Sequence, residues 1–284
     1  MLLTISSLLL IFFAFIAVWS SSQIKGQPLW LWFLCLGMCV GLYAQVLLPI
    51  SILWVGLALL LFWGLNKLPH IRPWIFWPLA VYLLIMGMRL LPGFPKVVLI
   101  EALPLGMSSH PVGLESSLAK PIAGLLAFAL IAQRCNGYHE LWKNFIRFEN
   151  WLISAGVVIA LAVLLGVPFD VKWVWWTPFF ILSNMILSVI PEEAFFRGFL
   201  QQPLQNKFGK VIWIVPVVGV LFAAVHSAPS HIAAWKFYAL FAFAGSAYAW
   251  SFQRTGKTET AIFAHTAVNA LHFLFLTYPV YFSQ

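Results

Sequence analysis

Two adjacent glutamates stand inside an otherwise apolar run, in the stretch "IPEEAFFRGFL" at residues 190–200. The chain is 62% hydrophobic and only 8% charged, so ionisable side chains within such a run are unusual. Glu193 and Arg197 are four residues apart and share a helix face, whereas Glu192 points about 100° away. We therefore expect Glu193 and Arg197 to pair structurally, and we expect Glu192, which lacks this partner, to be available for chemistry.

Two later apolar segments each carry a histidine on a helix face. Phe222 and His226 are four residues apart, as are His265 and Asn269, so each pair shares a face. A single membrane histidine is more often a packing residue than a catalytic one, and this interpretation stays open for each histidine alone. The segment from Glu192 to His226 can hold two helices of about 15 residues and a turn. Such a hairpin returns His226 to the level of Glu192, so we expect the two side chains to face each other.

The motifs follow one another as EExxxR at 192–197, FxxxH at 222–226 and HxxxN at 265–269. This ordered set resembles the CPBP family, which comprises CAAX-type prenyl-protein endopeptidases and related bacterial bacteriocin-processing and abortive-infection proteins. The resemblance covers roughly residues 175–278. It implies an intramembrane endopeptidase of the glutamic type, which hydrolyses peptide bonds of membrane-associated proteins or peptides.

The resemblance divides the motif residues into four with catalytic roles and three that support the site. The catalytic four are Glu192, His226, His265 and Asn269, and the supporting three are Glu193, Arg197 and Phe222. By this resemblance, the glutamate and the first histidine activate the attacking water, and the second histidine and the asparagine stabilise the oxyanion. A carboxylate in apolar surroundings binds a proton more readily than in water, and fixed donors there stabilise developing charge strongly. Both properties suit this chemistry.

An alternative uses three of the same residues as metal ligands. Glu192, His226 and His265 make a zinc set with one open position, which describes a zinc-dependent CAAX-type metalloprotease. The helical zinc signature HExxH is absent from the sequence. On the basis of the resemblance we favour no cofactor, and zinc remains the alternative that the sequence does not separate.

A second functional class involves no peptide-bond chemistry. A non-enzymatic membrane transporter or immunity protein could use Glu192 and the histidines as a buried proton or ion relay. Transporters more often show symmetric halves with broken helices in both. In this sequence the polar membrane residues lie in the C-terminal part, which favours the enzyme.

The elements that position these residues are predicted to be membrane helices. A mean hydropathy of +0.94 and continuous apolar segments predict an all-α, polytopic integral membrane helical bundle of about eight to ten transmembrane helices. We expect helices near 2–19, 28–46, 48–65, 74–92, 117–133, 150–166, 174–190, 211–226, 232–252 and 258–278. The broken segment 93–116 predicts a re-entrant or surface loop, and Pro191 predicts a break after which a new helix starts at Glu192.

The chain divides into residues 1–170, predicted to be N-terminal transmembrane scaffold helices, and residues 171–284, predicted to be the catalytic helical core. The 16 Lys and Arg residues are scattered between apolar runs, as in loops that flank membrane helices, and they form no nucleic-acid-binding patch. We expect membrane lipid and a membrane-near protein or peptide substrate as partners, and no nucleic acid. The resemblance suggests the bacterial cytoplasmic (inner) membrane as the location. His231 is expected in a loop.

Overall fold

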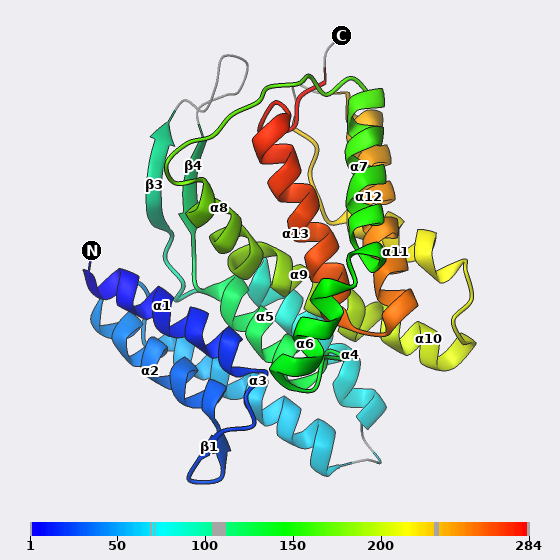
Figure 1. The fold of residues 1–284 in the computed structure, drawn as a ribbon. Helices are drawn as coiled ribbons and strands as arrows, with labels where there is room; N and C mark the ends of the chain where they lie inside the picture. The colour runs from blue at the N-terminus through cyan, green and yellow to red at the C-terminus, as the bar shows by residue number, and fades with distance from the viewer. Residues whose placement is uncertain (1, 69, 71, 104–111, 230–232, 283–284) are drawn as a thin grey trace.

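Helices make up most of the fold, which confirms the helical class predicted from the sequence (Figure 1). The structure is a computed structural model that describes all residues except 1, 69, 71, 104–111, 230–232 and 283–284. His231 therefore lies outside the described residues. The N-terminal helices gather on one side of a long central helix, and the C-terminal helices lie on its other side (Figure 1).

Most helices of the N-terminal part pack into one apolar core. The helices of this core are α1 (Leu2–Ala17), α2 (Leu29–Tyr43), α3 (Ile50–Lys67), α4 (Arg72–Gly87) and α5 (Ala119–Leu130). The next helix along the chain is α6 (Gly137–Ile146). Helix α5 is buried over most of its length, and the side chains of Ile122, Leu125 and Phe128 are fully buried. The same core includes Ile190 and Phe199 of the central helix. The two parts of the chain therefore share this core.

A second apolar core joins the central helix to the C-terminal helices. After the 3-10 turn η2 (Phe148–Asn150) come α7 (Leu152–Leu164), α11 (Ile214–Ala224), α12 (Ala234–Thr255) and α13 (Thr258–Phe275). Val158, Phe196 and Phe252 belong to this core. Helices α11 and α12 approach each other so closely that a Cβ atom on Gly219 would lie 2.1 Å from Ser246 Oγ. Small residues permit this packing.

The central helix runs without interruption from Thr177 to Phe208. Its consecutive parts are α8 (Thr177–Asn184), the π-helical η3 (Met185–Val189), α9 (Ile190–Glu193), the π-helical η4 (Ala194–Gln201) and α10 (Gln202–Phe208). The prediction that a new helix starts at Glu192 is therefore wrong. Pro191 removes one backbone N–H group, and the wider π-helical turns on both sides accommodate its ring without ending the helix.

Short β-hairpins within the described residues correct the all-α prediction. β1 (Gln23–Ile24) pairs with β2 (Gln27–Pro28), and β3 (Val97–Leu103) pairs antiparallel with β4 (Val112–Ser116). β3 and β4 lie within the segment 93–116, for which the sequence predicts a re-entrant or surface loop. The run of Val and Ile in β3 favours a strand. A Cβ atom on Gly113 would lie 2.9 Å from the Ile100 carbonyl oxygen, so glycine permits the close pairing.

Two helices of the described chain, Ile50–Lys67 and Thr177–Phe208, are long and apolar enough to cross a membrane by length and composition. Shorter apolar helices of 10–17 residues accompany them. A perpendicular span requires about 20 residues, so the predicted count of eight to ten spans remains a prediction.

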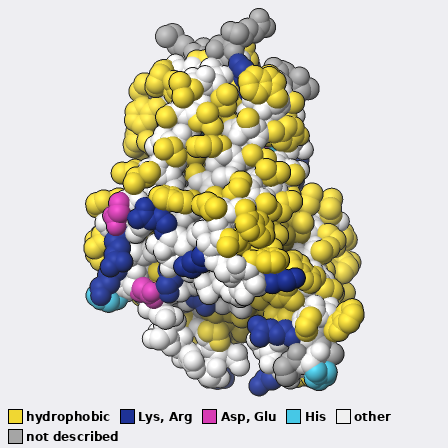
Figure 2. Space-filling view, turned by 90° about the vertical axis from the view of Figure 1, so that its right-hand side faces the viewer, with side chains coloured by type: hydrophobic (Ala, Val, Ile, Leu, Met, Phe, Trp, Pro, Cys, Tyr) yellow, Lys and Arg dark blue, Asp and Glu magenta, His cyan; other side chains and the backbone are white. Residues whose placement is uncertain are grey.

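The surface separates side chains by type. In Figure 2, hydrophobic side chains cover the upper part of one face, and Lys and Arg side chains gather in its lower part. The last turns of α10 and α12 carry Lys207 and Arg254, and the connections that follow these helices carry Lys210 and Lys257. Both connections lie in the lower half of Figure 1. One basic end beside an apolar belt is typical of a membrane protein.

Candidate active site

The predicted pairing of Glu193 with Arg197 is confirmed. Arg197 Nε donates to Glu193 Oε2 at 2.7 Å, and neither side chain is exposed. Arg197 also donates to Gln201 Oε1 at 2.8 Å, and Gln201 Nε2 donates to the Ala249 carbonyl oxygen. These bonds connect the central helix to α12 inside the core, so the pair stabilises the helix that carries Glu192.

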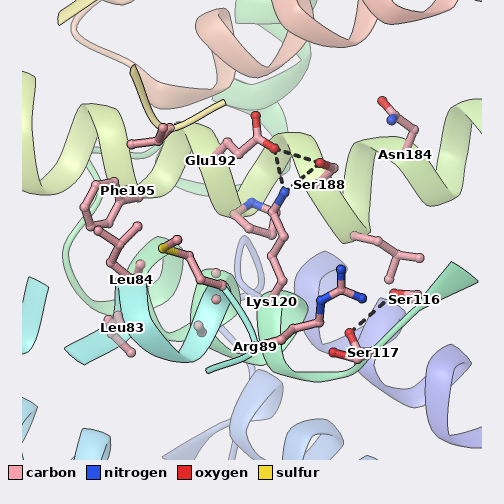
Figure 3. Close-up of a pocket in the computed structure, with 18 of the residues that line it drawn as sticks. Leu83, Leu84, Arg89, Ser116, Ser117, Lys120, Asn184, Ser188, Glu192 and Phe195 are labelled. Carbon is pink, nitrogen blue, oxygen red and sulfur yellow. Dashed lines mark hydrogen bonds and ion pairs between the residues drawn. The ribbon is translucent and has the colours of Figure 1, made fainter. Parts of the chain in front are cut away.

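Glu192 does not lack a partner, which corrects the expectation from its spacing. Lys120 Nζ lies 2.6 Å from Glu192 Oε1, and the Ser188 hydroxyl donates to the same oxygen at 2.8 Å. Lys120 Nζ also donates to Ser188 Oγ at 2.8 Å (Figure 3). Lys120 belongs to α5, and spacing within the central helix cannot reveal a partner from another helix. Oε1 of Glu192 is therefore occupied by two donors.

Close contact between α5 and the central helix brings Lys120 to Glu192. Gly124 lies four residues after Lys120, so the two residues share a face of α5. A Cβ atom on Gly124 would lie 2.4 Å from Pro191 Cβ, a distance that real side chains do not adopt. Glycine at this position therefore allows the two helices to touch beside Glu192, and the lysine one turn away reaches the carboxylate.

His226 faces Glu192, as the hairpin predicted. Its Nε2 lies 4.0 Å from Glu192 Oε2, which is too long for a direct hydrogen bond. Its Nδ1 lies 2.7 Å from the Phe222 carbonyl oxygen. Since a carbonyl oxygen only accepts, Nδ1 carries the hydrogen, and in the neutral ring Nε2 is left as an acceptor. A water molecule between Glu192 and His226 can contact both groups.

Phe222 holds the end of α11 against its neighbours. A Cβ atom on Gly245 would lie 2.6 Å from Phe222 Cβ, so α12 packs directly on this ring. The Phe222 ring centroid is 4.7 Å from that of His226 and 5.7 Å from that of His265. Phe222 thus contacts both motif histidines, and it fixes the position from which His226 extends toward Glu192.

His265 contacts Glu193. Its Nδ1 lies 2.9 Å from Glu193 Oε1, and its ring stacks on Tyr248 with centroids 4.4 Å apart and planes 12° apart. The His265 side chain is buried and does not line the cavity that contains Glu192. The structure therefore places His265 behind Glu193, where it contributes a third contact to the Glu193–Arg197 pair.

Asn269 contacts a residue of the central helix. Its Nδ2 donates to Asn184 Oδ1 at 2.8 Å, and Asn184, unlike Asn269, lines the cavity. Asn184 lies at the end of α8, two turns before Glu192 on the central helix. Sequence reasoning missed Asn184, Ser188 and Lys120. Ser188 was detectable in principle, because it is four residues before Glu192, but Lys120 had no local signal.

A cavity of about 590 Å³ contains Glu192 and His226. The central helix and the end of α11 form one wall, and α4, β4 and α5 form the opposite wall (Figure 3). Apolar side chains that line it include Leu83, Leu84, Leu187, Phe195, Phe196 and Val225. Polar side chains line both walls, with Ser188, Glu192 and His226 on the first and Arg89, Ser117 and Lys120 on the opposite one, and such groups can fix the orientation of a ligand.

A zinc site made of Glu192, His226 and His265 does not fit this arrangement. Within the described residues, no group of three or more His, Cys, Asp or Glu side chains is placed to hold a metal ion. The Lys120 ammonium lies 2.6 Å from Glu192 and would repel a second cation. His265 directs Nδ1 to Glu193.

Comparison with known proteins supports the motifs. Residues 174–271 match the model of a family described as type II CAAX prenyl endopeptidase Rce1-like. This segment contains EExxxR, FxxxH and HxxxN and ends within α13. No curated protein and no solved structure matches the chain. Rce1-like proteins are integral membrane proteases, so the match supports a membrane location. Over residues 174–271, the match confirms the resemblance to the CPBP family that the three motifs predicted.

Proposed function

We propose that the protein is an intramembrane endopeptidase that hydrolyses a peptide bond of a membrane-associated protein or peptide. The observation that carries this proposal is the gap of 4.0 Å between Glu192 Oε2 and His226 Nε2 on the wall of a cavity of about 590 Å³. A water molecule in this gap can contact both groups, and the cavity has room for a short peptide segment. The family match supports the same activity.

Glu192 is the general base in this mechanism. Lys120 and Ser188 both bind Oε1, which leaves Oε2 on the side of His226. The water gives a proton to Oε2 as its oxygen bonds to the scissile carbonyl carbon, while its second O–H group donates a hydrogen bond to His226 Nε2, which orients the attack. The proton then passes from Glu192 to the leaving amine as the C–N bond breaks, which restores the carboxylate.

Donors on the cavity wall stabilise the oxyanion of the tetrahedral intermediate in this proposal. Asn184 Oδ1 is bound by Asn269, so the amide N–H groups of Asn184 remain to donate, and the Lys120 ammonium is a second donor. The resemblance gives the oxyanion role to His265 and Asn269. We assign Asn269 to that role through Asn184, and we assign His265 to the positioning of Glu193.

Peptide cleavage by purified protein in detergent tests the proposal. A peptide library is incubated with wild type, Glu192→Gln and Glu115→Gln, where Glu115 lines the same cavity but pairs with Lys96. Loss of a general base lowers the rate by about 10²–10⁴-fold, so we expect cleavage by wild type and Glu115→Gln and almost none by Glu192→Gln. Equal cleavage by wild type and Glu192→Gln would remove Glu192 from the mechanism.

A strong chelator separates the remaining alternatives. Cleavage that survives chelation supports the metal-free glutamic mechanism, whereas loss on chelation with rescue by zinc supports the metalloprotease. If neither wild type nor the variants cleave any peptide, the neighbouring ionisable side chains of Lys120, Glu192 and His226 fit a non-enzymatic proton or ion relay better than a peptidase.

A further inference from the structure

We infer that Arg89 and Ser117 form a carboxylate-binding subsite of this cavity, so that the substrate presents an acidic group to the wall opposite Glu192. The inference rests on the proposed peptidase function. Both residues precede the matched segment 174–271. Arg89 follows α4, and Ser117 follows β4. Figure 3 shows both side chains near the backbone end of the Lys120 side chain, on the same wall of the cavity.

The first observation is an uncompensated charge. The charged side chains that line the cavity are Arg89, Glu115, Lys120 and Glu192. Glu192 pairs with Lys120 at 2.6 Å, and Glu115 pairs with Lys96 at 3.7 Å. In the part of the chain that the structure describes, no carboxylate forms an ion pair with Arg89. A guanidinium in this state presents a planar fork of donors that matches a ligand carboxylate.

The second observation is a buried hydroxyl group. The Ser117 side chain is 4% exposed and lines the cavity, yet its Oγ has no hydrogen-bond partner among the described residues. Buried polar side chains nearly always have a partner, so this hydroxyl is a donor that a ligand can use. A carboxylate oxygen can accept from Ser117 and Arg89 together.

Arg89 has a backbone conformation that arginine seldom adopts at the end of a helix. Arg89 has φ 62°, a left-handed conformation in which glycine is the usual residue after a helix. An exposed arginine at a helix end could also contact anionic lipid headgroups, but such a contact does not involve the buried Ser117 hydroxyl. A peptide carboxylate inside the cavity accounts for both residues.

Matched peptides test the subsite. Three peptide sets share one sequence library: one ends in a free carboxylate, one ends in an amide, and one ends in an amide but carries an aspartate side chain. Calorimetric binding and the KM and kcat of cleavage are measured for wild type, Arg89→Gln, Arg89→Gly, Ser117→Ala and Arg72→Gln. Arg72 begins the same helix at its other end and does not line the cavity, so it is the control.

We expect wild type and Arg72→Gln to bind at least one acidic set about tenfold more tightly than the neutral set, on the scale of one charge-assisted hydrogen bond. The acidic set that is preferred identifies the terminal or the side-chain carboxylate as the ligand. Arg89→Gln and Ser117→Ala should lose this preference through KM, with kcat retained. Arg89→Gly should lose it without a fall in unfolding temperature, because glycine suits the left-handed backbone.

Several results would overturn the subsite: equal binding of acidic and neutral peptides by wild type, a preference that persists in Arg89→Gln, or Arg89-dependent binding to phosphatidylglycerol nanodiscs without peptide. Binding is measured apart from turnover, so the two proposals fail separately. Glu192-dependent cleavage without acid preference retains the peptidase and rejects the subsite. Acid-selective binding without cleavage retains the subsite and rejects the peptidase.

Discussion

The two walls of the cavity differ in how their residues are specified. One wall, built from the central helix and α11, carries Glu192 and His226 and lies within the matched segment 174–271. The other wall, built from α4, β4 and α5, carries Arg89 and Lys120 and lies outside that segment. The first wall supplies the groups that act on water in the proposed mechanism. The second wall supplies the Lys120 ammonium that pairs with Glu192, and by our inference it also selects the substrate.

The buried pair behind the first wall should give the largest effect on stability. Arg197→Met leaves Glu193 buried without its main partner, and breaking such a pair costs roughly 3–5 kcal/mol. Glu192→Gln is the comparison, because Glu192 is partly exposed to the cavity and an amide can still accept from Lys120. The free energy of unfolding in detergent should fall much further for Arg197→Met. Equal losses would show that the two adjacent glutamates do not differ in role.

Lys120 joins the walls, and its removal should give the next largest effect. Lys120→Met removes the ammonium that binds Oε1 of Glu192, so the carboxylate loses a contact that holds Oε2 toward His226. We expect kcat to fall about tenfold to a hundredfold, the scale of one or two charge-assisted hydrogen bonds.

Lys120→Arg serves as the control for this change, since it keeps the charge and should retain most of kcat. A purely structural role for Lys120 would lower the amount of folded protein and leave the kcat of the folded protein unchanged. That result would assign the second wall to packing alone.

Sequence reasoning recovered what local spacing determines. Helical periodicity predicted the pairing of Glu193 with Arg197, and the length of the segment from Glu192 to His226 predicted that these two side chains meet. Both relations depend only on helix geometry and chain length. The helical class likewise follows from continuous apolar composition.

The features that the sequence did not predict arise from packing between distant segments. Lys120 reaches Glu192 because Gly124 lets α5 touch Pro191, and no periodicity within either helix encodes this contact. The unbroken helix through Pro191 depends on π-helical turns that single-sequence patterns do not reveal. β3 pairs with β4, and the broken pattern of segment 93–116, which predicts a loop, does not reveal this pairing.

Gly124 allows a smaller change that sharpens the comparison. Gly124→Ala places a Cβ atom 2.4 Å from Pro191 Cβ, so α5 must shift away from the central helix. Overpacking of this kind costs about 1–3 kcal/mol, and the shift should also weaken the contact between Lys120 and Glu192 and lower kcat. Gly156→Ala is the matched control, because a Cβ atom there has no neighbour within 4 Å. Unchanged activity in Gly124→Ala would mean that the two walls need not touch.

The smallest effect is expected away from both walls, where Lys257 Nζ lies 2.8 Å from Glu140 Oε1. Hydrogen bonds from Lys257 and from the Asn136 N–H group lower the pKa of Glu140 below its usual value of 4.5. The stabilisation is therefore present above that value and is lost as pH falls through the folded-state pKa. A partly exposed pair contributes less than about 1 kcal/mol, so Glu140→Gln should only slightly lower the unfolding temperature at neutral pH. As pH falls into the acid range, the unfolding temperature of the variant should decrease less steeply than that of wild type. Peptide cleavage should not change, because Glu140 does not line the cavity, and reduced cleavage would extend the functional region beyond the two walls.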